Sequence, residues 1–498
     1  MTPPSELFSS GNAAPVIARF LPDQRFDLQA TIVPDAADKT IIKAVFYIDG
    51  VEIKLPVSMK TCATGCLPKI EKNAAIVSIR ALSNTKPGLH VFTVEASQSD
   101  GQTIKASGNF EIVPWQVGGQ KVKNIIIMLG DGMGAAQRTA ARIVAQGYAQ
   151  GKSKSVLAMD TFPISGQIKT ASLNSLVTDS APGMSAYVLG NKNNNNEEGV
   201  FPDDTIDPFD NPRIEYSNMN VALDKIDGRR NIAKGIKGRV VDDYGFPDQP
   251  MLEEMTHKAL GVLQKNKKGF VLMVEGASID KQAHNMDTER WILDMIEFDR
   301  AIKVAQDFAE KDGQTLVIIT ADHECSGVAL IGGSTVTDAR LQELVKEGGV
   351  ANLRDKVVGV YEKAGFPNYK IASDGYPSTT DIDYRLLIGY GGNSDRHEDW
   401  RTNPLPMQDG QQPFGKTMPL SAYPADPVVR DAEGKFMITG QVPGNSGVHT
   451  ATDIPISAMG PGAWAFTGVL DNTDVFFHLA QAAVKGVVKP NFLASSKK

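Results

Sequence analysis

The sequence predicts an α/β fold with a mostly parallel central sheet flanked by helices on both faces, preceded by a small all-β sandwich domain. Before Gly118 apolar residues alternate with a period of two, whereas after it short apolar strands alternate with helical patterns. The length of 498 residues also suits two or three folding units. We therefore expect a sandwich over residues 1–118 and a second domain over 119–498.

The N-terminal region is expected to form short strands from about residue 15 to about residue 115. Ala44, Phe46 and Ile48 alternate before Asp49-Gly50, and a second alternating run follows, which is a hairpin pattern. About seven short strands in roughly a hundred residues are typical of an immunoglobulin-like β-sandwich. Because no catalytic cluster occurs there, we expect a spacer or adhesion module without chemistry of its own.

Buried strands and helices alternate in the second domain. Four apolar runs are expected to be strands, at residues 124–129, 269–275, 316–320 and 454–459. Helices are expected at about 135–146 and 287–310, where apolar residues recur at helical spacing. Strands joined through helices favour a sheet covered on both faces, and ligands of such folds bind beyond the carboxyl ends of the strands.

Two loop-rich segments interrupt this alternation, at residues 191–249 and about 332–443. We expect both to be insertions over the ligand site rather than parts of the sheet. His397, in the second segment, is interpreted as a loop residue at the mouth of the site, with substrate contact as the alternative.

The charge balance excludes some partners. Lys and Arg number 51 and Asp and Glu 58, which gives a net charge of −7, so we expect no broad basic face for nucleic acid or anionic lipid. The apolar runs are much shorter than the roughly 18 residues of a membrane helix, so no membrane span is expected. The N-terminus lacks the basic and apolar regions of a signal peptide, which indicates either a cytosolic protein or a mature form.

The three cysteines bear on the compartment. Cys62 and Cys66 are four positions apart, and no second Cys or His pair lies near them. A small-loop disulfide is therefore favoured over structural zinc, and it indicates an oxidising compartment. Two reduced thiols in a loop remain the alternative.

Residues that can bind metals cluster around the predicted strand ends. Seven such residues end or follow the first three predicted strands or precede the fourth. They are Asp131, Glu275, Asp280, His284, Asp322, His323 and His449. Asp280 and His284 are four apart and share one face of a helix turn. Imidazole mixed with carboxylate suits zinc. We predict one zinc held by Asp280, His284 and His449, and a second held by Asp131, Asp322 and His323.

Ser180 lies at an expected helix start, with Pro182 in the first turn. Taken alone, such a serine is a helix cap. Beside zinc, however, its hydroxyl can lose a proton near neutral pH without a histidine base, because coordination lowers the pKa of a bound oxygen. Two metals about 4 Å apart can stabilise the attacking and leaving oxygens of a phosphoryl displacement.

From about Lys123 to Gly468 the chain resembles the alkaline phosphatase family. The motifs GDGMG, TDSA, VEGxxID with a His four residues beyond the Asp, TADHE and HTxxDxPxxAxGPGA occur in family order. The resemblance implies a phosphomonoesterase with an alkaline optimum, periplasmic or secreted and usually a homodimer. It implies Ser180 as the phosphorylated nucleophile, the two zinc ions predicted above, and Asp131 with Glu275 reaching a third site that holds one magnesium ion.

The chain departs from the family pattern between the nucleophile and the VEG motif. The family's further magnesium ligands and its phosphate-clamping arginine belong to motifs that are not found there. We hypothesise that a segment is absent near Tyr216, which leaves the magnesium site half built. Arg213, Arg229 and Arg230 are the nearest arginines, and none matches the clamp by motif.

Two alternatives stay open. One is a phosphodiesterase or sulfatase-like relative that uses the same metals. The other is a weakly active metal-binding protein, which the missing clamp motif supports. Cys325 also stands where many relatives place a histidine behind the metal ligands, which is expected to alter metal tuning.

Overall fold

The computed structural model describes residues 1–4, 18–62, 72–149, 152–199, 250–331, 343, 346–347, 387–391 and 446–488. Contacts divide the chain into two compact units. The first unit contains residues 1–125, 168–218 and 461–498, and the second contains 126–167 and 219–460. The predicted domain boundary after residue 118 stays a prediction.

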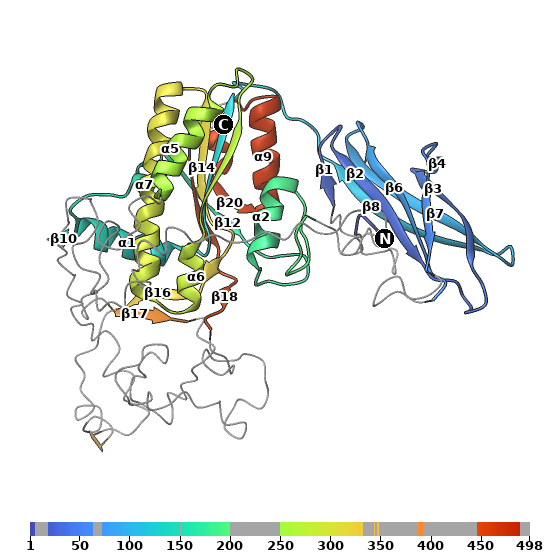
Figure 1. The fold of residues 1–498 in the computed structure, drawn as a ribbon, viewed down its shortest axis with the longest axis horizontal. Helices are drawn as coiled ribbons and strands as arrows, with labels where there is room; N and C mark the ends of the chain where they lie inside the picture. The colour runs from blue at the N-terminus through green and yellow to red at the C-terminus, as the bar shows by residue number, and fades with distance from the viewer. Residues whose placement is uncertain are drawn as a thin grey trace. The chain divides into compact units, whose positions relative to one another are not determined.

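The first unit begins with two β-sheets (Figure 1). In order, one sheet contains β1 (Arg19–Phe20), β8 (Thr103–Ile112), β7 (Gly88–Gln98), β3 (Ile41–Ile48) and β4 (Val51–Glu52). The other contains β2 (Arg25–Ile32), β6 (Ala75–Ser83) and β5 (Ser58–Thr61). Buried residues of both sheets form one core, so the all-β sandwich is present, while its immunoglobulin-like assignment stays a prediction.

Local sequence explains two features of this sandwich. Asp49 and Gly50 have φ angles of 50° and 79°, and Ile48 pairs with Val51 across the turn, so the predicted hairpin forms. Cys62 is disulfide-bonded, as its spacing favours. Its expected partner, Cys66, lies outside the described residues.

The first unit also contains α2 (Ser180–Leu189), η4 (Ala463–Phe466), β20 (Gly468–Asp471) and α9 (Asn472–Val484). Helices α2 and α9 pack against each other. Gly190 ends α2 with a φ of 74°, and a Cβ there would lie 2.5 Å from the Phe476 ring. Glycine is therefore needed both for the left-handed backbone and for the close helix contact.

The second unit is built on strands in the order β13 (Val271–Gly276), β9 (Asn124–Gly130), β14 (Thr315–Thr320), β19 (Ile454–Met459) and β12 (Ile164–Lys169). Its helices of eight or more residues, together with the shorter α6, are α1 (Ala135–Gln146), α5 (Leu252–Leu263), α6 (Ser278–His284) and α7 (Thr288–Asp312) in the part of the chain that the structure describes. The four predicted strands and two predicted helices form within two residues of their expected bounds. The α/β class is confirmed, and α7 contacts β13, β14 and the other three helices.

Short elements complete the second unit. They are β10 (Tyr148–Ala149), β11 (Lys152–Ser153), η1 (Ala158–Thr161), β15 (Glu324–Cys325), β16 (Val328–Ile331), β17 (Leu387–Tyr390) and β18 (His449–Thr450). The predicted insertions lie largely outside the described residues, and His397 and the three candidate arginines lie wholly outside them. Among the described helices, none has the length and apolar character that a bilayer crossing requires.

The pairing of β14 with β19 is antiparallel, with Val317 opposite Met459 and Ile319 opposite Ser457. This pair is therefore an exception in a sheet that was predicted to be mostly parallel. Because the two strands run in opposite directions, the start of β19 lies at the end of β14. His449, which precedes β19, thereby reaches the same edge as the residues that follow β14.

Candidate metal centre

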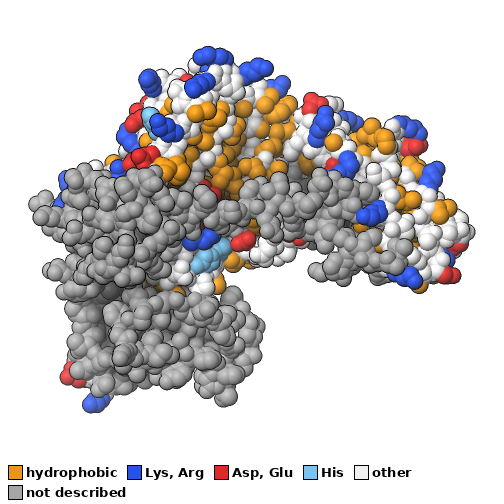
Figure 2. All heavy atoms as spheres, viewed as in Figure 1, with side chains coloured by type: hydrophobic (Ala, Val, Ile, Leu, Met, Phe, Trp, Pro, Cys, Tyr) orange, Lys and Arg blue, Asp and Glu red, His pale blue; other side chains and the backbone are white. Residues whose placement is uncertain are grey.

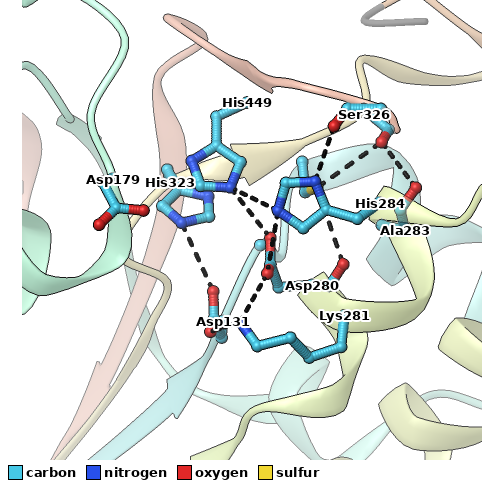
Figure 3. Close-up of polar contacts among 12 residues, drawn as sticks. Asp131, Asp179, Asp280, Lys281, Ala283, His284, His323, Ser326 and His449 are labelled. Atoms are coloured by element: carbon cyan, nitrogen blue, oxygen red, sulfur yellow. Dashed lines mark hydrogen bonds and ion pairs between the residues drawn. The ribbon is translucent and has the colours of Figure 1, made fainter. Parts of the chain in front are cut away.

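Three elements of the second unit bring the predicted ligands to one place. Asp131 follows β9, Asp280 and His284 lie on α6 directly after β13, and His323 follows β14. Figure 3 shows these side chains and His449 pointing toward one another. The prediction that they converge rested on strand ends meeting at one edge of a sheet, and the geometry agrees for these five residues.

Asp280, His284 and His449 form the first ligand group. Nε2 of His284 lies 3.3 Å from Oδ2 of Asp280, and Nε2 of His449 lies 3.3 Å from Oδ1 of the same carboxylate. The two Nε2 atoms are 2.9 Å apart. Three ligand atoms from two helix positions and one strand thus face a common point.

The backbone fixes the tautomer of His284. Its Nδ1 donates to the carbonyl oxygen of Gly447 at 2.7 Å, since a carbonyl can only accept. In the neutral ring Nε2 then carries a lone pair, which is the form a metal needs. The amide of Gly447 donates back to the carbonyl of His284 at 2.7 Å, which ties the segment before β18 to α6.

The group fits zinc. Ligands about 2.0–2.1 Å from a tetrahedral zinc lie roughly 3.3 Å from one another, close to the separations found here. Burial alone would raise the pKa of Asp280, but the imidazoles of His284 and His449 beside it hold that pKa well below its usual range. The carboxylate is therefore ionised, as metal binding requires.

A second group contains Asp131 and His323 and shares Asp280 with the first. One ligand atom from each of these three buried residues lies within 4.8 Å of the others. Nε2 of His323 is 3.5 Å from Oδ1 of Asp131 and 3.5 Å from Oδ2 of Asp322. The rings of His323 and His449 stack with their centroids 3.5 Å apart, so the two groups adjoin.

Acidic side chains crowd together in and beside the second group. Burial, and then the charge of Asp280, raises the pKa of Asp322 to about 7, and burial also raises the pKa of Asp131. Burial lowers the pKa of His323 to about 3, which keeps its ring neutral and able to bind a metal. Buried carboxylates that repel one another gain stability from a divalent cation, so this group also suits one.

Two predicted metal ligands, Asp322 and Glu275, lie outside both ligand groups. Asp322 is buried beside Asp131 and accepts from the backbone amide of Gly132 at 3.2 Å, but it belongs to neither ligand group of the described residues. Glu275 is exposed at the end of β13 and also belongs to neither group. Their roles as metal ligands stay predictions.

Lys281 was missed by sequence reasoning. Its Nζ lies 3.0 Å from Oδ2 of Asp280 and 3.7 Å from Oδ2 of Asp131. Although burial lowers its pKa, these two carboxylates raise it above the usual range, so the side chain is a cation. Lys281 directly follows Asp280 in the sequence, and this was the only indication of its role. The sequence does not show in which direction a lysine side chain points.

The centre reaches the surface. The side chains of Lys281 and His284 keep 36% and 30% of their exposure, and Figure 2 shows histidine atoms at the molecular surface beside basic and acidic side chains. A soluble ligand can therefore approach the first group.

Buried hydrogen bonds also fix the chain segment next to the centre. Glu324 accepts hydrogen bonds from Nε2 of Gln137 at 2.9 Å and from the amides of Gly327 and Val328 at 3.0 and 2.9 Å. These bonds hold the turn after β15, whose Cys325 pairs with His449. Sequence reasoning assigned no role to Glu324, because its partner on a helix, Gln137, is 187 positions away in the chain.

Ser180 belongs to the first unit, where it is the first residue of α2. Asp179 occupies the N-cap position, and Pro182 lies buried in the first turn. The predicted helix start is thus confirmed. The role of Ser180 as nucleophile stays a prediction.

Comparison with known proteins identifies one family. A family model described as alkaline phosphatase matches residues 122–206 and 215–485. Alkaline phosphatase 3 of Bacillus subtilis (strain 168) is 30% identical over 261 residues, which cover 50% of this chain and 50% of that protein. The alkaline phosphatase of Escherichia coli (strain K12) is 53% identical over 74 residues, 15% of this chain and 16% of that protein. The chain spans half the length of these relatives or less.

Solved structures give weaker likenesses. An alkaline phosphatase from the Antarctic bacterium TAB5 is 20% identical, with a TM-score of 0.40 over 74% of this chain and 99% of that one. The Thermus thermophilus alkaline phosphatase is 19% identical, with a TM-score of 0.43 over 75% and 94%. Family membership rests instead on the family model, which matches more than half of the chain.

Proposed function

The chain belongs to the alkaline phosphatase family, and from this premise we propose that it hydrolyses phosphate monoesters at a two-zinc site through a phosphoserine formed on Ser180. The observation that carries the proposal is the convergence of Asp280, His284 and His449 at separations that suit zinc. Helix capping, or histidines that only pack in a core, would not explain why two imidazoles and a buried carboxylate contact one another.

The proposed ligand sets follow the sequence prediction. Asp280, His284 and His449 hold one zinc, and Asp131, Asp322 and His323 hold the other. The ionised Asp280 and the neutral ring of His323 support this assignment, since ligands must give up their protons to bind a metal.

The chain itself supplies the nucleophile. When bound, the zinc ions supply Lewis acidity, which lowers the pKa of a nearby hydroxyl and neutralises charge on a phosphoryl group. The Ser180 hydroxyl gives its proton to solvent as Oγ forms a bond to phosphorus. The bond from phosphorus to the alcohol oxygen breaks at the same time, and the alcohol leaves with a proton from solvent. Water then attacks the phosphoserine, which releases phosphate and restores the hydroxyl. A serine at a helix start favours this role, because negative charge is stabilised there.

Finer features of the family are part of the proposal. Asp131 and Glu275 take part in a third site for one magnesium ion, which is incomplete because the family's further ligand motif is not found. The protein is periplasmic or secreted, which the disulfide of Cys62 supports because disulfides persist in oxidising compartments. It acts as a homodimer, and residues 1–118 form an immunoglobulin-like module with a partner still to be identified.

Trapping the covalent intermediate tests the proposal. The zinc-loaded protein is mixed with a labelled aryl phosphate and quenched with acid, and one labelled phosphate per chain is expected. Ser180→Ala should abolish the label and leave the metal content unchanged. Ser175→Ala, five residues earlier, is the matched control and should label like the wild type. Labelling of Ser180→Ala at the wild-type rate would show that another residue is the nucleophile.

The two alternatives have their own readouts. A phosphodiesterase or sulfatase-like activity predicts a faster rate on a diester or sulfate than on the monoester of the same alcohol. A weakly active metal-binding protein predicts bound zinc without turnover or labelled protein. A burst of alcohol followed by steady hydrolysis of the monoester excludes the second alternative, and a faster rate on the monoester than on the diester and the sulfate excludes the first.

A further inference from the structure

Cys325 lies beside the first ligand group, although it has no place in the ligand sets above. It is free and completely buried. Its Sγ and one ligand atom each from Asp280, His284 and His449 all lie within 4.8 Å of one another. The four residues together make an Asp, two His and a Cys, which is a donor set that zinc accepts.

Strand pairing directs the thiol to this place. Cys325 on β15 is directly opposite His449 on β18 in an antiparallel pair. Residues directly opposite each other project from the same side of such a pair. The thiol and the His449 imidazole therefore project from the same side of the strand pair. The amide of Cys325 also donates to the carbonyl of Gly132 at 3.1 Å, which holds this strand in place.

The sulfur is only loosely engaged elsewhere. Its nearest hydrogen-bonding atoms are the carbonyl oxygen of Asp280 at 3.8 Å and Oγ of Ser326 at 3.6 Å. Both are weak contacts for a thiol, and the Ser326 hydroxyl donates a stronger bond to the carbonyl of Ala283 at 2.7 Å. Turning the thiol toward the ligand group thus breaks no strong interaction.

We propose that Cys325 is a fourth protein ligand, as a thiolate, of the zinc ion held by Asp280, His284 and His449. This inference rests on the zinc site of the proposed function. Binding of the ion releases the thiol proton to solvent. Because catalytic zinc sites can expand to five ligands, a thiolate in the fourth position still leaves room for a phosphate oxygen.

A soft ligand changes which metals the site prefers. Thiolate favours zinc and other thiophilic ions, whereas a set of carboxylate and imidazole discriminates less among divalent metals. The site should therefore prefer cadmium or zinc over magnesium or manganese more strongly than a site without the sulfur. Replacing the sulfur with oxygen should reduce that preference.

X-ray absorption at the zinc edge tests the inference directly. The wild-type full-length chain loaded with two equivalents of zinc should show a sulfur neighbour at about 2.3 Å in addition to nitrogen and oxygen at about 2.0–2.2 Å. Cys325→Ser and Cys325→Ala should both lose the sulfur neighbour. Cys66 is retained in both variants, and Cys62 is disulfide-bonded, so the loss reports Cys325 alone.

The outcomes separate this inference from the proposed function. Bound zinc with only nitrogen and oxygen neighbours in the wild type overturns the ligand role of Cys325 and leaves the zinc site standing. Failure to bind zinc overturns both. A competition titration adds a second readout, because Cys325→Ser should lower the cadmium-to-zinc affinity ratio by about tenfold or more. An unchanged ratio contradicts the proposal, and the wild-type spectrum decides it even where a variant fails to fold.

Discussion

Nε2 of His449 lies 2.9 Å from Nε2 of His284, although 165 positions separate the two residues in the chain. Each nitrogen also faces an oxygen of the Asp280 carboxylate at 3.3 Å. Two imidazole nitrogens approach so closely only where they share a proton or a cation. Because Nδ1 of His284 donates to Gly447, Nε2 of the neutral ring presents a lone pair, which can face either a proton on His449 or a metal ion.

His449→Ala should remove one zinc per chain. The variant loses a direct ligand, so its zinc affinity should fall by more than the roughly 10–100-fold that loss of an outer partner costs. Metal analysis after dialysis checks the prediction. His257→Ala is the matched control, because His257 is exposed on α5 and belongs to neither ligand group. Two zinc ions retained in His449→Ala would remove His449 from the site.

Chelation should inactivate the protein, and zinc should restore activity better than magnesium does. The physical reason is that the buried groups combine imidazole with carboxylate, which zinc prefers to a greater degree than magnesium does. Hydrolysis of an aryl phosphate is measured after exhaustive dialysis and after each metal is returned. Full activity in the dialysed protein would contradict the metal assignment.

Asp299 should make stability depend on pH. It is 8% exposed on α7, and its two oxygens accept from the amides of Ala158 and Met159 at 2.9 Å each. Burial raises its pKa from 3.8 to about 6 against the effect of these hydrogen bonds. The folded protein therefore binds this proton more tightly, so the stabilisation is complete below about pH 4 and is lost as the pH rises through about 6.

The variant Asp299→Asn does not titrate, so its destabilisation relative to wild type should be largest near pH 4. It should shrink by at most about 3 kcal/mol by pH 7, because each unit of pKa shift is worth about 1.4 kcal/mol. Urea unfolding of both proteins in the same metal-free buffers measures the difference. A difference that is independent of pH would show that Asp299 has an ordinary pKa.

Asn191 should stabilise the contact between β1 and the end of α2 within the first unit. Its Oδ1 accepts from the amide of Arg19 at 2.8 Å, and its Nδ2 donates to the carbonyl of Arg19 at 2.9 Å. Asn191→Ala leaves both backbone groups without this partner, and we expect a loss of about 2 kcal/mol in the free energy of unfolding. Asn266→Ala, at an exposed turn, should change it by less than about 0.5 kcal/mol.

The sequence alone was sufficient for four strands and two helices of the second unit and for the convergence of several of their flanking residues. Periodicity placed the four strands and the helices α1 and α7 within two residues, because burial of one face imposes its period on the chain. The rule that strand ends share an edge then predicted that Asp131, Asp280, His323 and His449 meet. The insertions, and with them any arginine clamp, fall outside the described residues, so those expectations stand as they were.

What the sequence determined by itself was which side chains leave the sheet at its ligand-binding edge, since strand ends and helix turns are set by local pattern. Only the tertiary structure decided how those side chains are grouped: the antiparallel course of β19 brings His449 to the end of β14, Asp280 serves both groups, and Cys325 and Lys281 join them. The physical reason is that spacing along the chain constrains contacts within a turn or a strand, whereas contacts between distant segments depend on strand direction and register.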